Sequence, residues 1–279
     1  PTVVSPGSEE ARLKEKRNIG GIARRATMVA KIRADLAPKR TPVWLIDAGD
    51  FSDGTPFSTE YHGEADVAAM NAAGYMFATI GNHEFNNPMA QTKKLVGLAT
   101  YPILLANAVD RTTRQPIGQP WRVEKIGAAR VGLFGMVTAD AGTYPAAKEG
   151  IDVLDPFATA KEMVKTLKSR ADIVILISHC GDDVDNRLAA EVPGIDVIIG
   201  GHSHSRLPVG EFVWRSDDLK VDGVNGTVIV QAYQWGGELG RLDLLFRRAV
   251  NGTWSVDRYR ERLVPITEAT TADASVAAV

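Results

Sequence analysis

Short apolar runs alternate with segments of helical spacing along most of this chain. The predicted strands are VWLID at 43–47, YMFATI at 75–80, PILLANA at 102–108, IVILISH at 173–179 and DVIIG at 196–200. The predicted helices cover about 21–37, 64–73, 88–98, 155–170 and 184–192. The runs WRVEKI and ARVGLFGMV, joined through Gly127, predict a hairpin, and the segments after residue 226 are predicted to be all strand. Alternating strands and helices with a β-rich end indicate α/β layers.

Proline marks several predicted boundaries. Asn87-Pro88 and Asp155-Pro156 each suit an N-cap followed by a first helical turn, where the missing N–H of proline is not needed. Residues 1–18 are rich in charge and are predicted to be a loop. After Pro265 the tail has the composition of a linker, so we expect one domain over residues 1–265 and the start of a linker over 266–279.

Four of the predicted strands end in a cluster of small polar side chains. The clusters are LIDAGDFSDG, ATIGNHE, ILISHCGDD and IIGGHSHS, and every histidine except His62 lies in one of them. In open α/β sheets, ligands bind beyond the carboxyl ends of the strands. The sequence therefore predicts that these clusters form one shared site.

The side chains in these clusters suit a divalent metal ion. The candidate ligands are Asp50, Asn82, His179, His202 and His204. Carboxylate, amide oxygen and imidazole together suit Mn²⁺ or Zn²⁺. Asp50 can bridge two ions ~3.5–4 Å apart, as in sites that hydrolyse phosphoesters. His202 and His204 would face opposite ways on a regular strand, but on a loop after Gly200-Gly201 they can reach two adjacent ions.

Each of these residues also has a purely structural explanation. A single histidine at a strand end is more often a satisfied loop residue than a ligand, while Asp50 alone would be a turn residue and Asn82 a helix cap. The recurrence of four clusters in one context favours the site. Glu60 and His62 imitate a ligand pair, but they precede a predicted helix in a Ser- and Gly-rich loop, and we expect them at the surface. Cys180 is expected to be a small buried thiol.

The composition narrows the range of partners. Lys and Arg total 32 against 34 Asp and Glu, and a net charge of −2 gives no basic field for a nucleic-acid polymer, although a nucleotide is not excluded. No apolar run approaches the ~18–20 residues of a membrane helix, and no secretory signal is visible. A single cysteine excludes an intrachain disulfide.

Taken together, these stretches resemble the calcineurin-like metallophosphoesterases, most closely the phosphatase domain of 5′-nucleotidases and 2′,3′-cyclic-nucleotide phosphodiesterases. The matching motifs are IGGIARR, DAGDFSDGTPF, GEADVAAMNAAGY, GNHEF, ISHCG, VPGIDVIIGGHSH and VIVQAYQWGGELGRLDL, in family order. The resemblance implies a four-layer α-β-β-α sandwich of two mixed sheets and two divalent ions, Mn²⁺ or Zn²⁺. It also implies hydrolysis of nucleotides by attack of a metal-bound water, and a periplasmic or secreted location.

Residue by residue, the resemblance makes Asp50 the metal bridge. It implies that one metal site is completed by Asn82, His179 and His202, and that the other is served by His204. The catalytic histidine would be His83, and the resemblance places both Asn82 and His83 against the substrate. Asn86, three residues after the catalytic histidine, would orient its ring.

Three features depart from the family pattern. The family opens with a strand ending in Asp-x-His, whose side chains ligate the first metal, and no such triplet occurs here. The chain is then either a fragment or a remnant that binds metal poorly, and the intact later motifs favour a fragment. Asn86 stands where 5′-nucleotidases typically have Asp, and an amide cannot stabilise imidazolium by charge. The C-terminal domain that supplies nucleotide recognition is absent.

These departures keep other functions open. The cyclic-nucleotide phosphodiesterase branch often has asparagine at the position of Asn86. A sulfur-ester hydrolase can use the same scaffold. A third alternative is an inactive binding or scaffold module that has lost one metal site.

Overall fold

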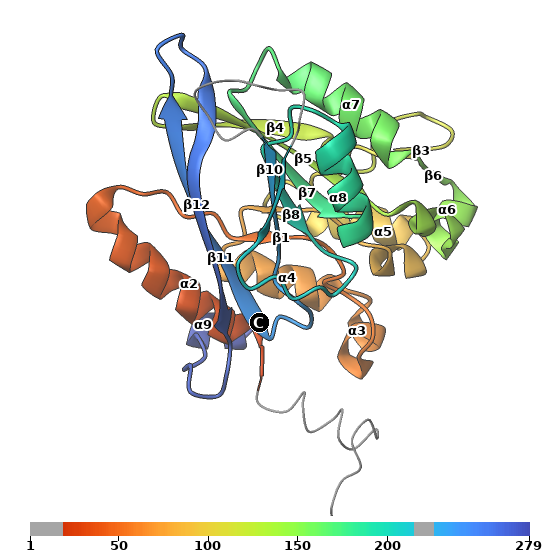
Figure 1. Ribbon diagram of the computed structural model, residues 1–279. Helices are drawn as coiled ribbons and strands as arrows, with labels where there is room; N and C mark the ends of the chain where they lie inside the picture. Colours follow the sequence, from red (N-terminus) through yellow and green to blue (C-terminus); the bar gives the residue numbers. More distant parts are fainter. Residues whose placement is uncertain (1–18, 215–225) are drawn as a thin grey trace, which may run out of the picture.

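Six strands form the main sheet of the protein, whose computed structural model describes residues 19–214 and 226–279 (Figure 1). In order across the sheet, the strands are β4 (Trp121–Ile126), β5 (Ala129–Val137), β7 (Ile173–His179), β8 (Val197–Gly200), β10 (Gly226–Gln231) and β9 (Glu211–Trp214). The four inner strands run parallel, and β4 and β9 pair antiparallel at the two edges. The sheet is therefore mixed, and the predicted hairpin through Gly127 is confirmed as β4–β5.

Three smaller pairs of strands complete the β structure. They are β1 (Ile46–Asp47) with β2 (Phe77–Ala78), β3 (Ala108–Asp110) with β6 (Ile151–Val153), and the long hairpin of β11 (Glu238–Arg248) and β12 (Trp254–Pro265). The continuous strand predicted at 102–108 is wrong. Ile103 bridges to Ala78 while Leu104 bridges to Gln119, so the segment changes partners and forms no ladder before β3.

Helices cover both outer faces of the strands (Figure 1). The longer helices are α2 (Ile22–Leu36), α4 (Glu64–Ala73), α5 (Met89–Leu98), α7 (Pro156–Leu167) and α8 (Asp182–Glu191). The shorter ones, which the sequence did not predict, are α3 (Pro56–Tyr61), α6 (Pro145–Glu149), α9 (Ala274–Ala277) and the 3₁₀ turns η1 (Ala37–Lys39), η2 (His83–Asn86) and η3 (Ala139–Thr143). None of the described helices is long and apolar enough to span a membrane.

Three apolar clusters define four layers. One cluster joins α2 and α4 to β2 and includes Val29, Met70 and Ala78. A second lies between the main sheet and α7 and α8, where Leu167 and Leu188 are fully buried. The third lies between the main sheet and the β1–β2 and β11–β12 pairs. The order of the layers is therefore helix, sheet, sheet, helix, as expected. All seven residues of β7 are buried, which explains why its sequence begins with a continuous apolar run.

One of the two predicted proline caps is confirmed. The Asp155 carboxylate accepts the N–H of Ala158 at 2.7 Å and caps α7. The cap predicted at Asn87 is wrong, since α5 begins one residue later with Pro88 at the N-cap and no side-chain cap of its own. Glu149 takes over that role from another part of the chain, because its carboxylate accepts the N–H of Met89 at 2.9 Å.

The tail predicted to begin a linker packs against the domain. Ile266 is fully buried and Val276 is 5% exposed. The N–H of Asp273 donates to the carbonyl oxygen of Ala23 in α2, so α9 is held against that helix. Ile266, Asp273 and Val276 therefore contact the folded unit, while the boundary at 265 and a following domain stay predictions. The loop predicted at residues 1–18 lies outside the described residues.

Candidate metal centre and active site

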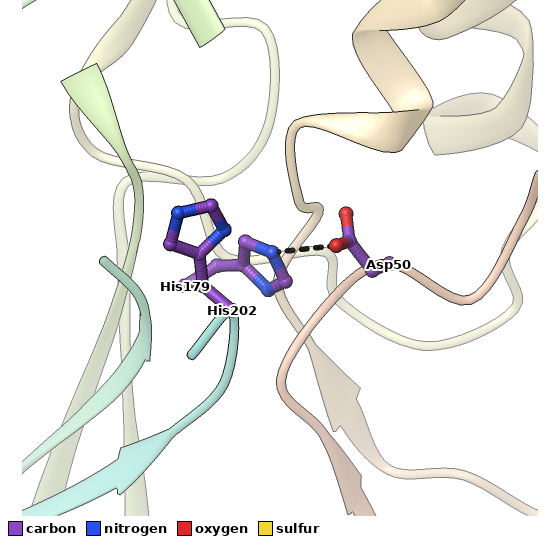
Figure 2. A group of neighbouring side chains, drawn as sticks. All are labelled: Asp50, His179 and His202. Carbon is purple, nitrogen blue, oxygen red and sulfur yellow. Dashed lines mark ion pairs between the residues drawn. The ribbon is translucent and has the colours of Figure 1, made fainter. Parts of the chain in front are cut away.

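The polar clusters of the sequence come together at one edge of the sheets. β1 and β2 run parallel and end shortly before Asp50 and Asn82. β7 ends at His179, and its parallel neighbour β8 ends just before His202. Side chains from separate strand ends therefore point toward one another (Figure 2).

Asp50, His179 and His202 form a compact group of potential metal ligands (Figure 2). One ligand atom from each residue lies within 4.8 Å of the other two. Oδ2 of Asp50 is 3.0 Å from Nε2 of His179, and the two imidazole rings have centroids 5.2 Å apart. One carboxylate and two imidazoles are ligands that Zn²⁺ and Mn²⁺ accept. Of the predicted ligands, these three are brought together.

A backbone hydrogen bond on the side away from Asp50 fixes the orientation of the buried His179 ring. Its Nδ1 lies 2.6 Å from the carbonyl oxygen of Ala48, so Nδ1 donates and Nε2 is left for a ligand. Nε2 faces Oδ2 of Asp50 at 3.0 Å as an ion pair, without the geometry of a hydrogen bond to any described residue. Burial disfavours a charged ring, but the Asp50 carboxylate outweighs burial and raises the pKa of His179. Burial likewise works against the Asp50 charge, yet contact with His179 lowers the pKa of Asp50. The site therefore favours a positive charge between the two side chains, and a divalent cation would supply one.

The backbone at this centre adopts conformations that side chains rarely take. Asp50 has φ 56° and His202 has φ 73°, both in the left-handed region. Gly49, at φ 94°, precedes Asp50, and a Cβ there would lie 2.6 Å from the amide nitrogen of Gly81. A Cβ on Gly81 would lie 2.1 Å from Oδ1 of Asp50. The two glycines thus let the loops approach closely enough to place the carboxylate.

Asn82 supplies a buried amide oxygen that lacks a partner. The residue is 4% exposed, and its Nδ2 donates to the hydroxyl oxygen of Tyr144 at 3.0 Å. Its Oδ1 has no hydrogen bond from any described residue. Leaving such an atom unsatisfied costs about 1–3 kcal/mol, and a cation would satisfy it. The next residue, His83, donates its backbone N–H to Oδ1 of Asp50 at 2.9 Å, which ties the two loops together. These residues fit a divalent cation.

The comparison with protein families agrees with this geometry. The model of the calcineurin-like phosphoesterases matches residues 19–206. The chain belongs to this family. The 5′-nucleotidase of Vibrio cholerae is 31% identical over 268 residues, which cover 88% of this chain and 48% of that protein. The chain therefore spans about half the length of the curated relatives it matches.

Solved structures with this phosphoesterase fold superimpose on most of the chain. The 5′-nucleotidase precursor of Thermus thermophilus gives a TM-score of 0.79 at 26% identity, covering 93% of this chain and 52% of that one. The sulfate thiohydrolase SoxB of the same organism gives 0.82 at 23% identity, covering 99% and 50%. The latter likeness shows the fold alone. The predicted two-sheet sandwich is confirmed.

Glu84, to which no role could be assigned from the sequence, organises the loops of this site. Its side chain is fully buried, and its carboxylate accepts the N–H groups of Asp50 at 3.0 Å, Ser52 at 2.9 Å and Gly81 at 2.6 Å. Burial raises the pKa of Glu84 to about 6, and the charge of Asp50 adds to this effect. Its position within GNHE was the only signal, because two of the three amides, those of Asp50 and Ser52, come from another loop that only the fold brings close.

His83 and Asn86 lie beside the candidate ligand Asp50, together with a third residue, Asp53. Nε2 of His83 is 3.9 Å from Oδ2 of Asp50, and its Nδ1 is 3.0 Å from Oδ2 of Asp53. Asn86 also donates to Asp53. Burial lowers the pKa of His83, but the hydrogen bond to Asp53 and the charges of Asp50 and Asp53 raise it overall. Asp53 was not among the residues predicted from the sequence, and it brings to His83 the carboxylate that the amide of Asn86 does not supply.

The remaining candidates are not members of this group. His204 is exposed and is not one of the three clustered ligands, so its place at a second ion stays a prediction. Glu60 and His62 are exposed, as expected for surface residues. Cys180 is 5% exposed and burial raises its pKa, which confirms a small buried thiol.

Proposed function

We propose that this chain is the metal-dependent catalytic part of a phosphoric ester hydrolase that acts on nucleotides. The observation that carries the proposal is the convergence of Asp50, His179 and His202 on one point. His83 stands beside that point, with its Nε2 directed to the same carboxylate. Membership of the calcineurin-like phosphoesterases and the similarity to proteins named 5′-nucleotidase support the class of substrate.

The chain's own residues divide the work of hydrolysis. Asp50, Asn82, His179 and His202 would hold a divalent ion, which when bound would neutralise phosphate oxygens and lower the pKa of a bound water. His83 faces the ion-binding carboxylate through Nε2 and protonates the leaving-group oxygen as its bond to phosphorus breaks. Asn82 and His83 also contact the phosphate. Glu84 holds the loop after β1 and the loop after β2 in fixed positions through its hydrogen bonds to their backbone N–H groups.

Two ions, Mn²⁺ or Zn²⁺, are proposed for the complete centre. The clustered donors account for one ion, while His204 is the residue proposed for the other. Because the sequence contains no Asp-x-His triplet, whose side chains ligate the first metal in the family pattern, we expect this chain to bind an ion at that first site weakly or not at all.

A cavity of about 430 Å³ beside His202 suits the uncharged part of a substrate. Asp140, Asp182 and Asp183 line it. Their carboxylates disfavour a second phosphate there but can accept hydrogen bonds from sugar hydroxyls. We infer that the phosphate binds at the metal side of His202 and the sugar toward this cavity.

A periplasmic or secreted location is also proposed. It is supported by the family resemblance alone, and fractionation of cells that express the full gene tests it.

The test of the proposed activity is hydrolysis by the Mn²⁺- or Zn²⁺-loaded protein. Adenosine 5′-monophosphate, 2′,3′-cyclic adenosine monophosphate and a thiosulfate ester would be assayed side by side. Faster release of phosphate from the 5′-monophosphate supports the proposal, and preference for either other substrate favours the corresponding alternative. No turnover of any substrate, with metal bound, would favour an inactive module. His62→Ala is a control, since His62 is exposed and outside the site.

A further inference from the structure

The imidazole of His83 lies between two carboxylates. Nδ1 is 3.0 Å from Oδ2 of Asp53, on the side away from the metal ligands. Nε2 is on the opposite side of the ring, 3.9 Å from Oδ2 of Asp50. The ring therefore presents one nitrogen to the site and the other to Asp53.

The contacts around Nδ1 of His83 show that this nitrogen carries a proton. The amide nitrogen of Asn86 lies 3.2 Å from Nδ1 of His83 and also donates to Oδ2 of Asp53. If Nδ1 were unprotonated, its lone pair would face the carboxylate at 3.0 Å, which is repulsive. With a proton on Nδ1, both His83 and Asn86 donate to the same carboxylate oxygen, and all the groups are satisfied. The Asn86 amide therefore donates a hydrogen bond to the Asp53 carboxylate, and that carboxylate accepts a hydrogen bond from the His83 ring and fixes its orientation.

Asp53 is itself fixed by the loop that carries it. Its backbone has φ 80°, a left-handed conformation that few side chains adopt. Its N–H donates to Oγ of Ser58 at 2.6 Å, and its Oδ1 accepts the N–H of Gly54 at 2.7 Å. Ser58 is 5% exposed and donates in turn to Asp66 at 3.2 Å. Such a conformation persists where its surroundings determine it, as at functional sites.

We propose that Asp53 is the positioning residue for His83, orienting its ring and stabilising its positive charge during the reaction. This proposal rests on the proposed function. It assigns to Asp53, which lies thirty residues before His83, the role that position 86 would hold if it were an acid. The arrangement follows the principle by which a carboxylate behind a catalytic histidine fixes its tautomer and stabilises imidazolium.

The proton balance of the step is as follows. A P–O bond forms to the oxygen of water while the P–O bond to the leaving group breaks. His83 begins the step as imidazolium, with protons on both Nδ1 and Nε2, and gives its Nε2 proton to the leaving oxygen, which departs as an alcohol; Nδ1 keeps its proton toward Asp53. One proton of the water returns to His83 through solvent, and the other stays on the phosphate. Asp53 remains ionised throughout.

The substitution Asp53→Asn removes the charge and keeps the shape. Turnover of adenosine 5′-monophosphate should fall by about tenfold to a thousandfold. This loss is comparable with, or smaller than, the loss of general acid catalysis itself, and KM should change little. p-Nitrophenyl phosphate has a leaving group that needs little protonation, so its turnover should fall much less. A role confined to folding would lower both substrates alike.

A second variant moves the carboxylate instead of removing it. Because Asn86 is within 3.2 Å of Nδ1, Asp53→Asn combined with Asn86→Asp offers the ring a new carboxylate. This double variant should regain most of the nucleotide turnover. Glu60→Gln, an exposed residue of α3, is the matched control and should retain wild-type rates.

Nitrogen-15 NMR of the histidine rings supplies a readout that does not depend on turnover. His83 should show a protonated Nδ1 in the wild-type protein, and that signal should shift in Asp53→Asn but persist in Glu60→Gln. Normal nucleotide turnover in Asp53→Asn, or equal losses on both substrates, would overturn the role of Asp53 alone. No turnover in the wild-type protein would overturn the proposed function, and the catalytic role of Asp53 with it.

Discussion

The buried carboxylate of Glu84 accepts the backbone N–H of Asp50 at 3.0 Å, across 34 positions of sequence. The same carboxylate accepts the N–H groups of Ser52 and Gly81, so one side chain joins the loop after β1 to the loop after β2. The Asp50 carboxylate, a proposed metal ligand, is thereby positioned through its backbone, while its side-chain oxygens stay available for the N–H of His83 and for the ring of His179.

Glu84→Ala should destabilise the protein and disorganise the metal site. It leaves three N–H groups without their acceptor, each costing about 1–3 kcal/mol if it stays buried, so we expect a loss of roughly 3 kcal/mol or more in the free energy of unfolding. Urea unfolding measures the loss, and Glu60→Ala at an exposed site should leave stability within about 0.5 kcal/mol of wild type. A loss below 1 kcal/mol in Glu84→Ala would contradict the organising role.

His83→Ala should separate catalysis from metal binding. The side chain is not among the proposed ligands, so metal content should match that of wild type. Turnover of a nucleoside monophosphate should fall by about 10²- to 10⁴-fold, the range for losing a general acid. Elemental analysis and steady-state kinetics on the same preparation check both statements. Unchanged turnover would refute the role assigned to His83.

Gly81→Ala should damage the site through geometry alone. The added methyl group would lie 2.1 Å from Oδ1 of Asp50, so the carboxylate or the loop must move. We expect weaker metal binding and lower activity in a protein that still folds. Gly97→Ala is the control, because a Cβ there meets no atom within 4 Å. Equal metal affinity in the two variants, by calorimetric titration with Mn²⁺, would show that the close approach is not needed.

Stability should depend on pH through Glu261, a residue of β12. Burial raises the pKa of this carboxyl from 4.5 to about 8. Between these values the folded protein retains the proton that the unfolded chain releases, so stability falls as pH rises from about 4.5 to 8. Glu261→Gln cannot ionise and should lose less stability between pH 5 and pH 8. Urea unfolding at both pH values tests this, with Glu268→Gln at an exposed site as the control. Parallel losses in wild type and Glu261→Gln would exclude the explanation.

Much of the site could be predicted from the sequence because its parts follow buried strands. His179 and His202 stand directly after apolar runs, and parallel strands bring such positions to one edge. Asp50 and Asn82 follow for the same reason. The family motifs add roles to these positions, but their nearness already follows from the strand pattern.

The parts that could not be predicted depend on side chains reaching between loops. Asp53 meets His83 only because its backbone turns into the left-handed region, a conformation that sequence does not reveal for an aspartate. Glu84 is an acid in a polar stretch, and its burial follows from amides contributed by other segments. Glu149 replaces the expected cap at Asn87 in the same way. Local patterns located the strand ends, whereas the hydrogen bonds between loops required the fold.

The most direct test of this account is the metal content of the purified chain after loading with Mn²⁺ or Zn²⁺. The account predicts a bound ion in the wild-type protein that is retained in His62→Ala and lost in His179→Ala and Asp50→Ala, with all variants folded by circular dichroism. An ion content that is the same in all four proteins, or absent from the wild type, would contradict the metal centre.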